Sequence, residues 1–63
     1  MNFVQDEDVF YVDRDNRKYL FSERRGGVLI FFDILTKKNV VLNSVGRYRW
    51  DNQDDNRDII AKV

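Results

Sequence analysis

The chain has 63 residues, and its eleven basic and eleven acidic side chains give a formal net charge of zero. It contains no cysteine and no histidine, which excludes disulfides, thiolate or imidazole metal sites, and the Ser-His or Cys-His pairs of nucleophilic catalysis. A neutral chain has no global attraction to nucleic acid or to an anionic membrane, so any such binding requires a local patch.

Length and composition indicate a single domain that spans residues 1–63. A chain this short buries only about 60% of the surface of its unfolded state, but an aromatic content of 14% supplies large side chains for a core. The segment Met1–Asp8 is acidic and lacks the hydrophobic stretch of a signal peptide. We therefore expect a complete small gene product of the cytoplasm, with no membrane partner.

The first half of the chain predicts two hairpins. Asp15-Asn16 and Gly26-Gly27 are candidate two-residue turns, and adjacent glycines both adopt the positive φ that a type I′ turn requires. Each turn independently predicts a register, and the two registers agree, which supports the pairing. They place six apolar side chains on one face of a sheet: Phe10, Val12, Tyr19, Phe21, Phe32 and Ile34.

The second half predicts a third hairpin and two more strands. Lys37-Lys38-Asn39 is the candidate turn, because Asn tolerates the left-handed conformation, and its register adds Val40 and Leu42 to the same face. Further strands are expected at 47–50 and, after a polar loop, at 59–63. The alternative for the last segment is a short C-terminal helix capped by Asp51 or Asn52.

The strand expected at residues 28–35 is apolar on both faces except at Asp33, whereas a strand with one face in water should alternate. Its second face, formed by Leu29, Phe31 and Leu35, therefore needs cover. We predict an all-β fold, an antiparallel meander of five or six short strands that curls into an SH3-like or OB-like barrel. The alternative is that another chain covers this face.

The sequence predicts no enzymatic activity, no metal and no cofactor. Hydroxyl residues such as Ser22 and Ser44 lie in no catalytic motif. Asp54, Asn56 and Asp58 alternate like the first ligands of a calcium loop, but Ile occupies the position of the expected glycine and the closing Glu is missing. We interpret this segment as a solvated turn.

Residues 47–50, with the sequence Arg-Tyr-Arg-Trp, are the most informative segment. On a strand, Arg47 and Arg49 share one face, while Tyr48 and Trp50 share the other. Aromatic side chains beside arginines are typical of single-stranded nucleic-acid binding, and further cations at one end of the meander would support it: Arg14, Arg17, Lys37 and Lys38. The competing interpretation is that both aromatic residues complete the core.

A small domain without catalytic groups acts through its surface. The leading hypothesis is a protein–protein interaction module, a stand-alone regulator or inhibitor such as a phage encodes, with a protein partner of unknown identity. The expected contact surface is Leu29, Phe31 and Leu35, or the region of Tyr48 and Trp50. Alternatives are nucleic-acid binding, a homodimer through the central strand and, as a minor one, acidic mimicry of nucleic acid.

Overall fold

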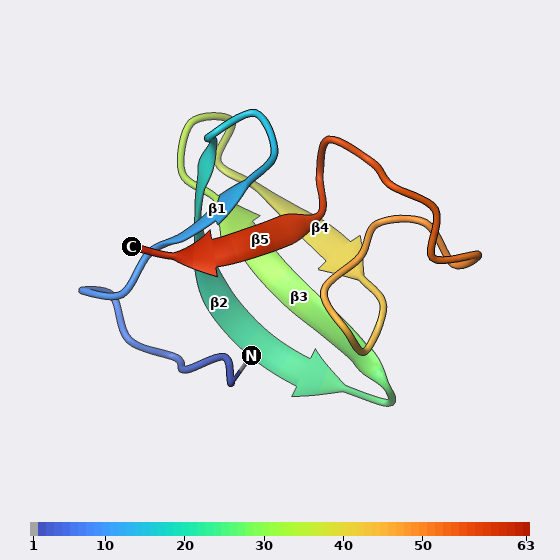
Figure 1. The fold of residues 1–63 in the computed structure, drawn as a ribbon. Coiled ribbons are helices and arrows are strands. Elements are labelled where there is room, and N and C mark those ends of the chain that lie inside the picture. The colour runs from blue at the N-terminus through green and yellow to red at the C-terminus, as the bar shows by residue number, and fades with distance from the viewer. Residues whose placement is uncertain (1) are drawn as a thin grey trace.

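A computed structural model describes residues 2–63 as one antiparallel sheet of five strands (Figure 1). Consecutive strands pair, and the fifth returns to the first, which gives the order β4-β3-β2-β1-β5. The strands are β1 (Tyr11–Asp13), β2 (Lys18–Arg25), β3 (Val28–Asp33), β4 (Lys38–Leu42) and β5 (Ile59–Lys62). The predicted all-β meander and the final strand are confirmed, and the helical alternative at the C-terminus is wrong.

The sheet curls but does not close into the predicted barrel, because β4 and β5 do not pair with each other. In Figure 1, β1 and β5 fold over β3, while β4 and β5 remain the two edges of the sheet. The turn after β4 spans the gap, because the Ile59 N–H donates to the Gly46 carbonyl at 3.0 Å. Gly46 has a φ of +85°, and a Cβ there would lie 3.2 Å from the Phe3 ring. No helix in the described residues is long and apolar enough to cross a membrane.

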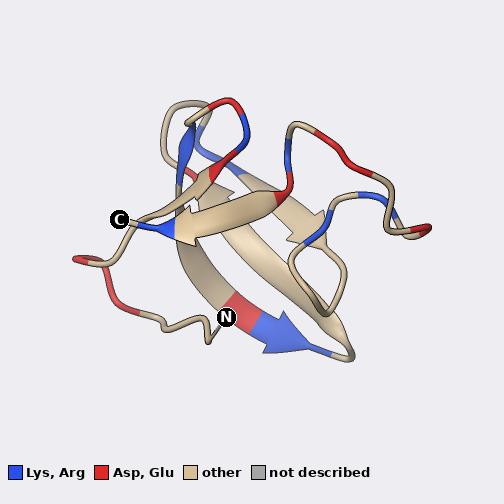
Figure 2. Cartoon of the chain, in the orientation of Figure 1, with Lys and Arg blue, Asp and Glu red and all other residues tan. Residues whose placement is uncertain are grey.

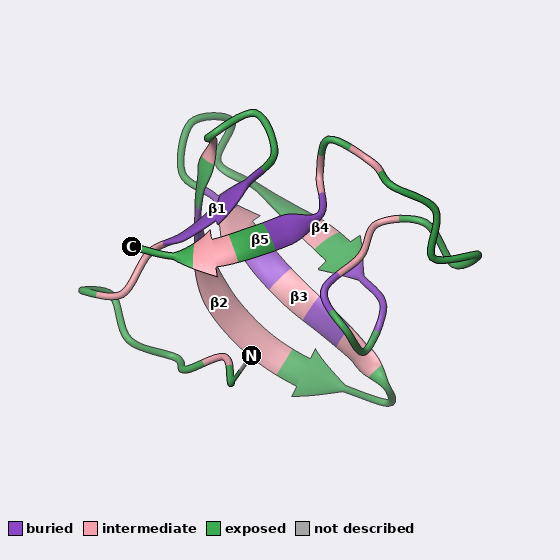
Figure 3. Cartoon of the chain, viewed as in Figure 1, coloured by how far each residue is buried: buried purple, intermediate pink, exposed green. Residues whose placement is uncertain are grey.

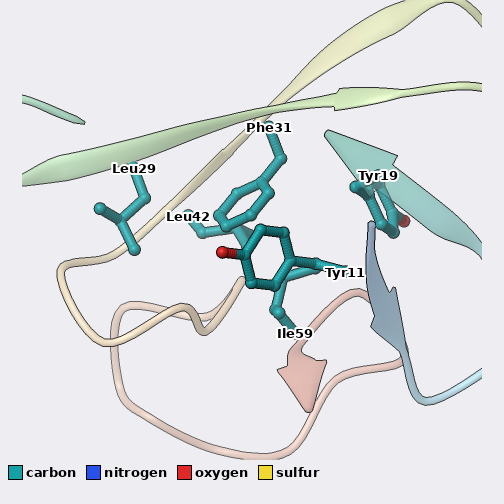
Figure 4. Close-up of a cluster of buried hydrophobic side chains, with 6 residues drawn as sticks. All are labelled: Tyr11, Tyr19, Leu29, Phe31, Leu42 and Ile59. Carbon is teal, nitrogen blue, oxygen red and sulfur yellow. The ribbon is translucent and has the colours of Figure 1, made fainter. Parts of the chain in front are cut away.

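The core lies on the concave side of the sheet and is largely aromatic (Figure 4). Phe31 is at its centre, with its ring centroid 5.8 Å from that of Tyr11 and 5.1 Å from that of Phe3, both in edge-to-face geometry. The N-terminal segment is held there because Val4 N–H donates to the Tyr11 hydroxyl at 2.8 Å. The buried cluster comprises Tyr11, Tyr19, Leu29, Phe31, Leu42 and Ile59.

A bulge in β2 reverses the predicted faces of β3. Arg25 pairs with Val28 as predicted, but the register shifts between Phe21 and Glu23, so that Phe21 lies opposite Phe31 rather than Phe32. A shift of one residue moves every later side chain to the other face. Ile34 is consequently exposed, and Phe32 is only partly buried.

The predicted partner surface on the second face of β3 is therefore corrected. Leu29 and Phe31 are both 0% exposed and belong to the core, so they have no surface to offer a partner. Leu35 lies beyond the end of β3 and is 81% exposed. Both faces of β3 are apolar, each for its own reason. One face forms the core, and the other, which includes Phe32, is half-buried on the outside of the sheet (Figure 3).

The first and third turns also differ from the prediction. The first is a three-residue loop, in which Asp13 N–H donates to the Arg17 carbonyl at 3.1 Å, so Tyr11 rather than Val12 faces Tyr19. The third turn occupies residues 34–37, with Lys37 at a φ of +60°, and places Phe31 opposite Val40. The first loop is longer than the predicted turn at residues 15–16. The third is longer than the predicted turn at residues 37–39 and begins earlier in the chain.

Buried Asp and Asn side chains cap three of these loops. In each loop one Oδ1 atom accepts two backbone N–H groups, at 2.9–3.2 Å, from residues that lie two to four positions later in the chain. The accepting side chains are Asp13, Asp33 and Asn43. Such side-chain bonds reproduce the hydrogen bonds of a backbone turn. These hydrogen bonds explain how a chain without proline forms tight hairpins. They also explain why the apolar strand β3 ends with a carboxylate, that of Asp33.

The face assignment is testable with two adjacent phenylalanines. Phe31→Ala should remove about 3–5 kcal/mol of stability, comparable with all that a core of this size supplies, about 3–5 kcal/mol, and leave the chain largely unfolded. Phe32→Ala, on the outer face, should cost about 1 kcal/mol. Far-UV circular dichroism and urea titration measure both, and equal losses would contradict the register.

Candidate functional site

A surface hollow of about 670 Å³ lies beside the end of β4, between that strand and the loop 48–57. We name it the Trp50 hollow. It combines the exposed Trp50 with an exposed residue of β4, Val41, and with paired charges at its rim. Its lining is Val41, Tyr48, Arg49, Trp50, Asp51, Asp55 and Arg57.

Residues 47–50 form a loop and not the predicted strand, so the expected alternation of arginine and aromatic faces is wrong. Asn43, at the end of β4, fixes the loop: its Nδ2 donates to the Asn52 Oδ1 at 2.7 Å and to the Arg49 carbonyl at 3.3 Å. Tyr48 packs against the core, whereas Trp50 is 67% exposed. The interpretation that both aromatic residues complete the core therefore holds for Tyr48 alone.

Tyr48 and Arg57 both line the hollow and stack on each other. The guanidinium carbon of Arg57 lies 3.4 Å from the centroid of the Tyr48 ring, which is cation–π stacking. Arg57 also donates through Nε to Asp55 Oδ1 at 2.9 Å. This hydrogen bond is the main reason that the pKa of the Asp55 carboxyl is lowered and that of Arg57 raised.

The buried carboxylate of Asp58 ties the hollow to the rest of the fold. Its Oδ1 accepts the Tyr48 N–H at 2.9 Å, and its Oδ2 accepts the Asp55 N–H at 3.0 Å and two guanidinium N–H groups of Arg14 at 3.3 Å. Burial raises the pKa of Asp58, but these donors outweigh it and the net pKa is lowered. The carboxylate is therefore ionised at neutral pH and holds two lining residues of the hollow, Tyr48 and Asp55, in place.

The arginines of the nucleic-acid hypothesis all contact carboxylates. Arg47 and Arg14 both reach Asp54, at 3.3 and 3.2 Å. Arg49 and Arg17 pair with carboxylates nearby in sequence, at 3.0 and 2.8 Å. Red and blue segments accordingly alternate along the loop between β4 and β5 (Figure 2). The structure thus joins these arginines to acidic partners and forms no uniformly basic surface from them.

The remaining predicted cations lie at the other end of β4, where Lys38 begins the strand and Lys37 precedes it. The first and third turns do lie together there, as expected for successive hairpins, because residues 16–18 and 34–35 line one hollow of about 420 Å³. Leu35, the exposed member of the predicted surface of Leu29, Phe31 and Leu35, belongs to this end and not to the Trp50 hollow.

The carboxylates of the acidic segment 54–58 contact arginine side chains. Asp54 and Asp58 both accept hydrogen bonds from Arg14, and no group of three or more acidic side chains suited to a metal ion occurs among residues 2–63. The arrangement of charges is instead a set of ion pairs that fixes the loop.

Four lining residues of the hollow were not among the predicted site residues: Val41, Asp51, Asp55 and Arg57. Val41 faces outward because Val40 faces the core, so the alternation of β4 could have identified it. Arg57 stacks on a residue nine positions earlier, for which the sequence carries no local signal. Comparison of the chain with family models, curated proteins and solved structures finds no match.

The sole tryptophan gives a direct probe of the site. Because the Trp50 side chain is largely in water, its fluorescence should have the red-shifted emission of free tryptophan and be strongly quenched by acrylamide. Emission spectra and Stern–Volmer plots measure both properties. Blue-shifted, shielded emission from the monomer would contradict the open hollow.

Asp58→Asn should weaken the fold by about 1–3 kcal/mol at neutral pH, because the buried donors lose a charged acceptor. The pKa of Asp58 is lower in the folded state, so its contribution is present above the unfolded value and is lost as pH falls through the folded pKa, below 3.8. The variant should therefore lose less stability on acidification. Urea titrations at several pH values measure this.

Asp54→Asn is the matched control, because Asp54 contacts the same arginine but its side chain is 75% exposed. Exposed ion pairs contribute about 0–1 kcal/mol, so this variant should resemble the wild type. An equal effect of the two substitutions would show that Asp58 does not have the special role assigned to it.

Proposed function

We propose that the protein is a non-enzymatic protein–protein interaction module that binds its partner through the Trp50 hollow. The observation that carries the proposal is the exposure of Trp50 on a loop that ion pairs and Asn43 hold in place. Trp, Tyr and Arg are the residues enriched in interface hot spots. A loop that is already ordered loses little entropy on binding.

In this role the protein regulates or inhibits a larger protein, as a phage-encoded cytoplasmic regulator does. The strand order supports the SH3-like form of the predicted fold over the OB-like form. Consecutive strands pair in a meander, whereas the OB-fold is a Greek-key barrel.

Single-stranded nucleic acid ranks lower as a ligand, because phosphates would have to displace the carboxylates that contact the arginines.

Selection from a displayed library of random linear peptides tests the surface. Peptides retained by the wild type should lose binding to Trp50→Ala, because the main apolar anchor is removed. They should keep binding to Leu35→Ala, which truncates an even more exposed apolar residue at the other end of β4. Fluorescence or calorimetric titration measures the affinities, and circular dichroism confirms that both variants fold.

The outcome that would overturn this proposal is loss of binding in Leu35→Ala with none in Trp50→Ala. Salt separates the rival ligand class. Apolar peptide binding should change little with ionic strength, whereas contacts to phosphate weaken steeply as salt releases counterions. Tight, strongly salt-dependent binding of a single-stranded oligonucleotide would place nucleic acid first.

A further inference from the structure

We propose that the partner segment binds as an extended strand that pairs with the free edge of β4 and inserts an apolar side chain into the Trp50 hollow. The inference rests on the proposed function and specifies the chemistry of the partner. It would extend the sheet by one strand, a mode in which backbone hydrogen bonds give affinity and alternate side chains give specificity.

The edge of β4 is suited to this pairing. β4 is the outermost strand and pairs only with β3, in an uninterrupted register over five residues from Lys38 to Leu42. In an antiparallel ladder every second residue directs its N–H and C=O away from the neighbouring strand, here toward solvent. Natural edges are usually blocked by proline, charge or a bulge, and the only charge on β4 is Lys38 at its start.

The opposite edge of the sheet is less available. The pairing of β5 with β1 is interrupted by a register shift between Val12 and Asp13, and bulges of this kind disturb the ladder. At the start of β5 the Ile59 N–H already donates to the Gly46 carbonyl. β4 is therefore the edge at which an added strand meets regular, unoccupied backbone.

The hollow adjoins this edge through Val41, which is 47% exposed and lines it. A strand paired with β4 would place a side chain between Val41 and Trp50. At the other end of β4, Lys37 and Lys38 form no ion pair with any of residues 2–63. The complementary segment is thus about five residues and about 16 Å long, apolar or aromatic near Trp50 and acidic at its other end.

A backbone N-methyl scan of peptides selected on the wild-type protein tests the pairing. Methylation of amides that bond to β4 should lower affinity about five- to a hundredfold, and methylation of the intervening amides should have little effect, which gives a period of two residues. Val41→Lys should also weaken binding, because it adds a charge at the edge and fills the hollow. Val45→Lys is the matched control, since Val45 is 64% exposed and lies outside β4.

The outcomes separate the two proposals. A scan without alternation, for peptides that still require Trp50, would overturn the strand and leave the proposed function standing. Alternation with dependence on Val41 but not on Trp50 would keep the edge and reject the hollow as the anchor. No peptide retained by the wild type would overturn both. A dimer by light scattering with β4 amides protected from hydrogen exchange would place a second copy at the edge and reject a foreign strand.

Discussion

The buried carboxylate of Asp58 is the interaction on which the rest of the site depends. It accepts backbone N–H groups from Tyr48 and Asp55 and a guanidinium from Arg14. Tyr48 and Asp55 belong to the loop between β4 and β5, and Arg14 belongs to the turn after β1, so one side chain fixes two distant parts of that loop and joins them to the turn. A buried carboxylate without donors would be strongly unfavourable. Because its oxygens are bonded, an irregular loop obtains a defined geometry.

The same hydrogen-bond pattern recurs in two turns, Asp13–Arg17 and Asn43–Arg47. In each turn the first residue donates its N–H to the fifth carbonyl and accepts the fifth N–H through its side-chain Oδ1. The fourth residue, Asn16 or Gly46, has a positive φ. In a chain that lacks proline, side-chain oxygens thus define the turns. The second occurrence directs the chain away from β4 and toward the Trp50 hollow.

Much of the fold could be predicted because it depends on local residues. Apolar alternation indicates strands, adjacent glycines indicate the turn at 26–27, and Ile and Val favour the final strand. The faces could not be predicted, because the bulge between Phe21 and Glu23 inserts a residue that no local pattern marks. Asp33 carried the missing information: its carboxylate accepts hydrogen bonds from the third turn, which fixes where β3 ends.

The candidate site was located by its residue types, but its geometry depends on contacts that are distant in sequence. Arg14 and Asp58 lie 44 positions apart, and the same Asp58 carboxylate accepts the Tyr48 N–H and so positions residues 47–50. The ion pairs that fix the loop also involve its arginines, so carboxylates offset the positive charge that would attract a phosphate. What remains accessible is the indole of Trp50 and the unpaired backbone of β4. Under the proposed function, recognition at this site depends on apolar contact and backbone hydrogen bonds, which favours an extended polypeptide over a phosphate backbone.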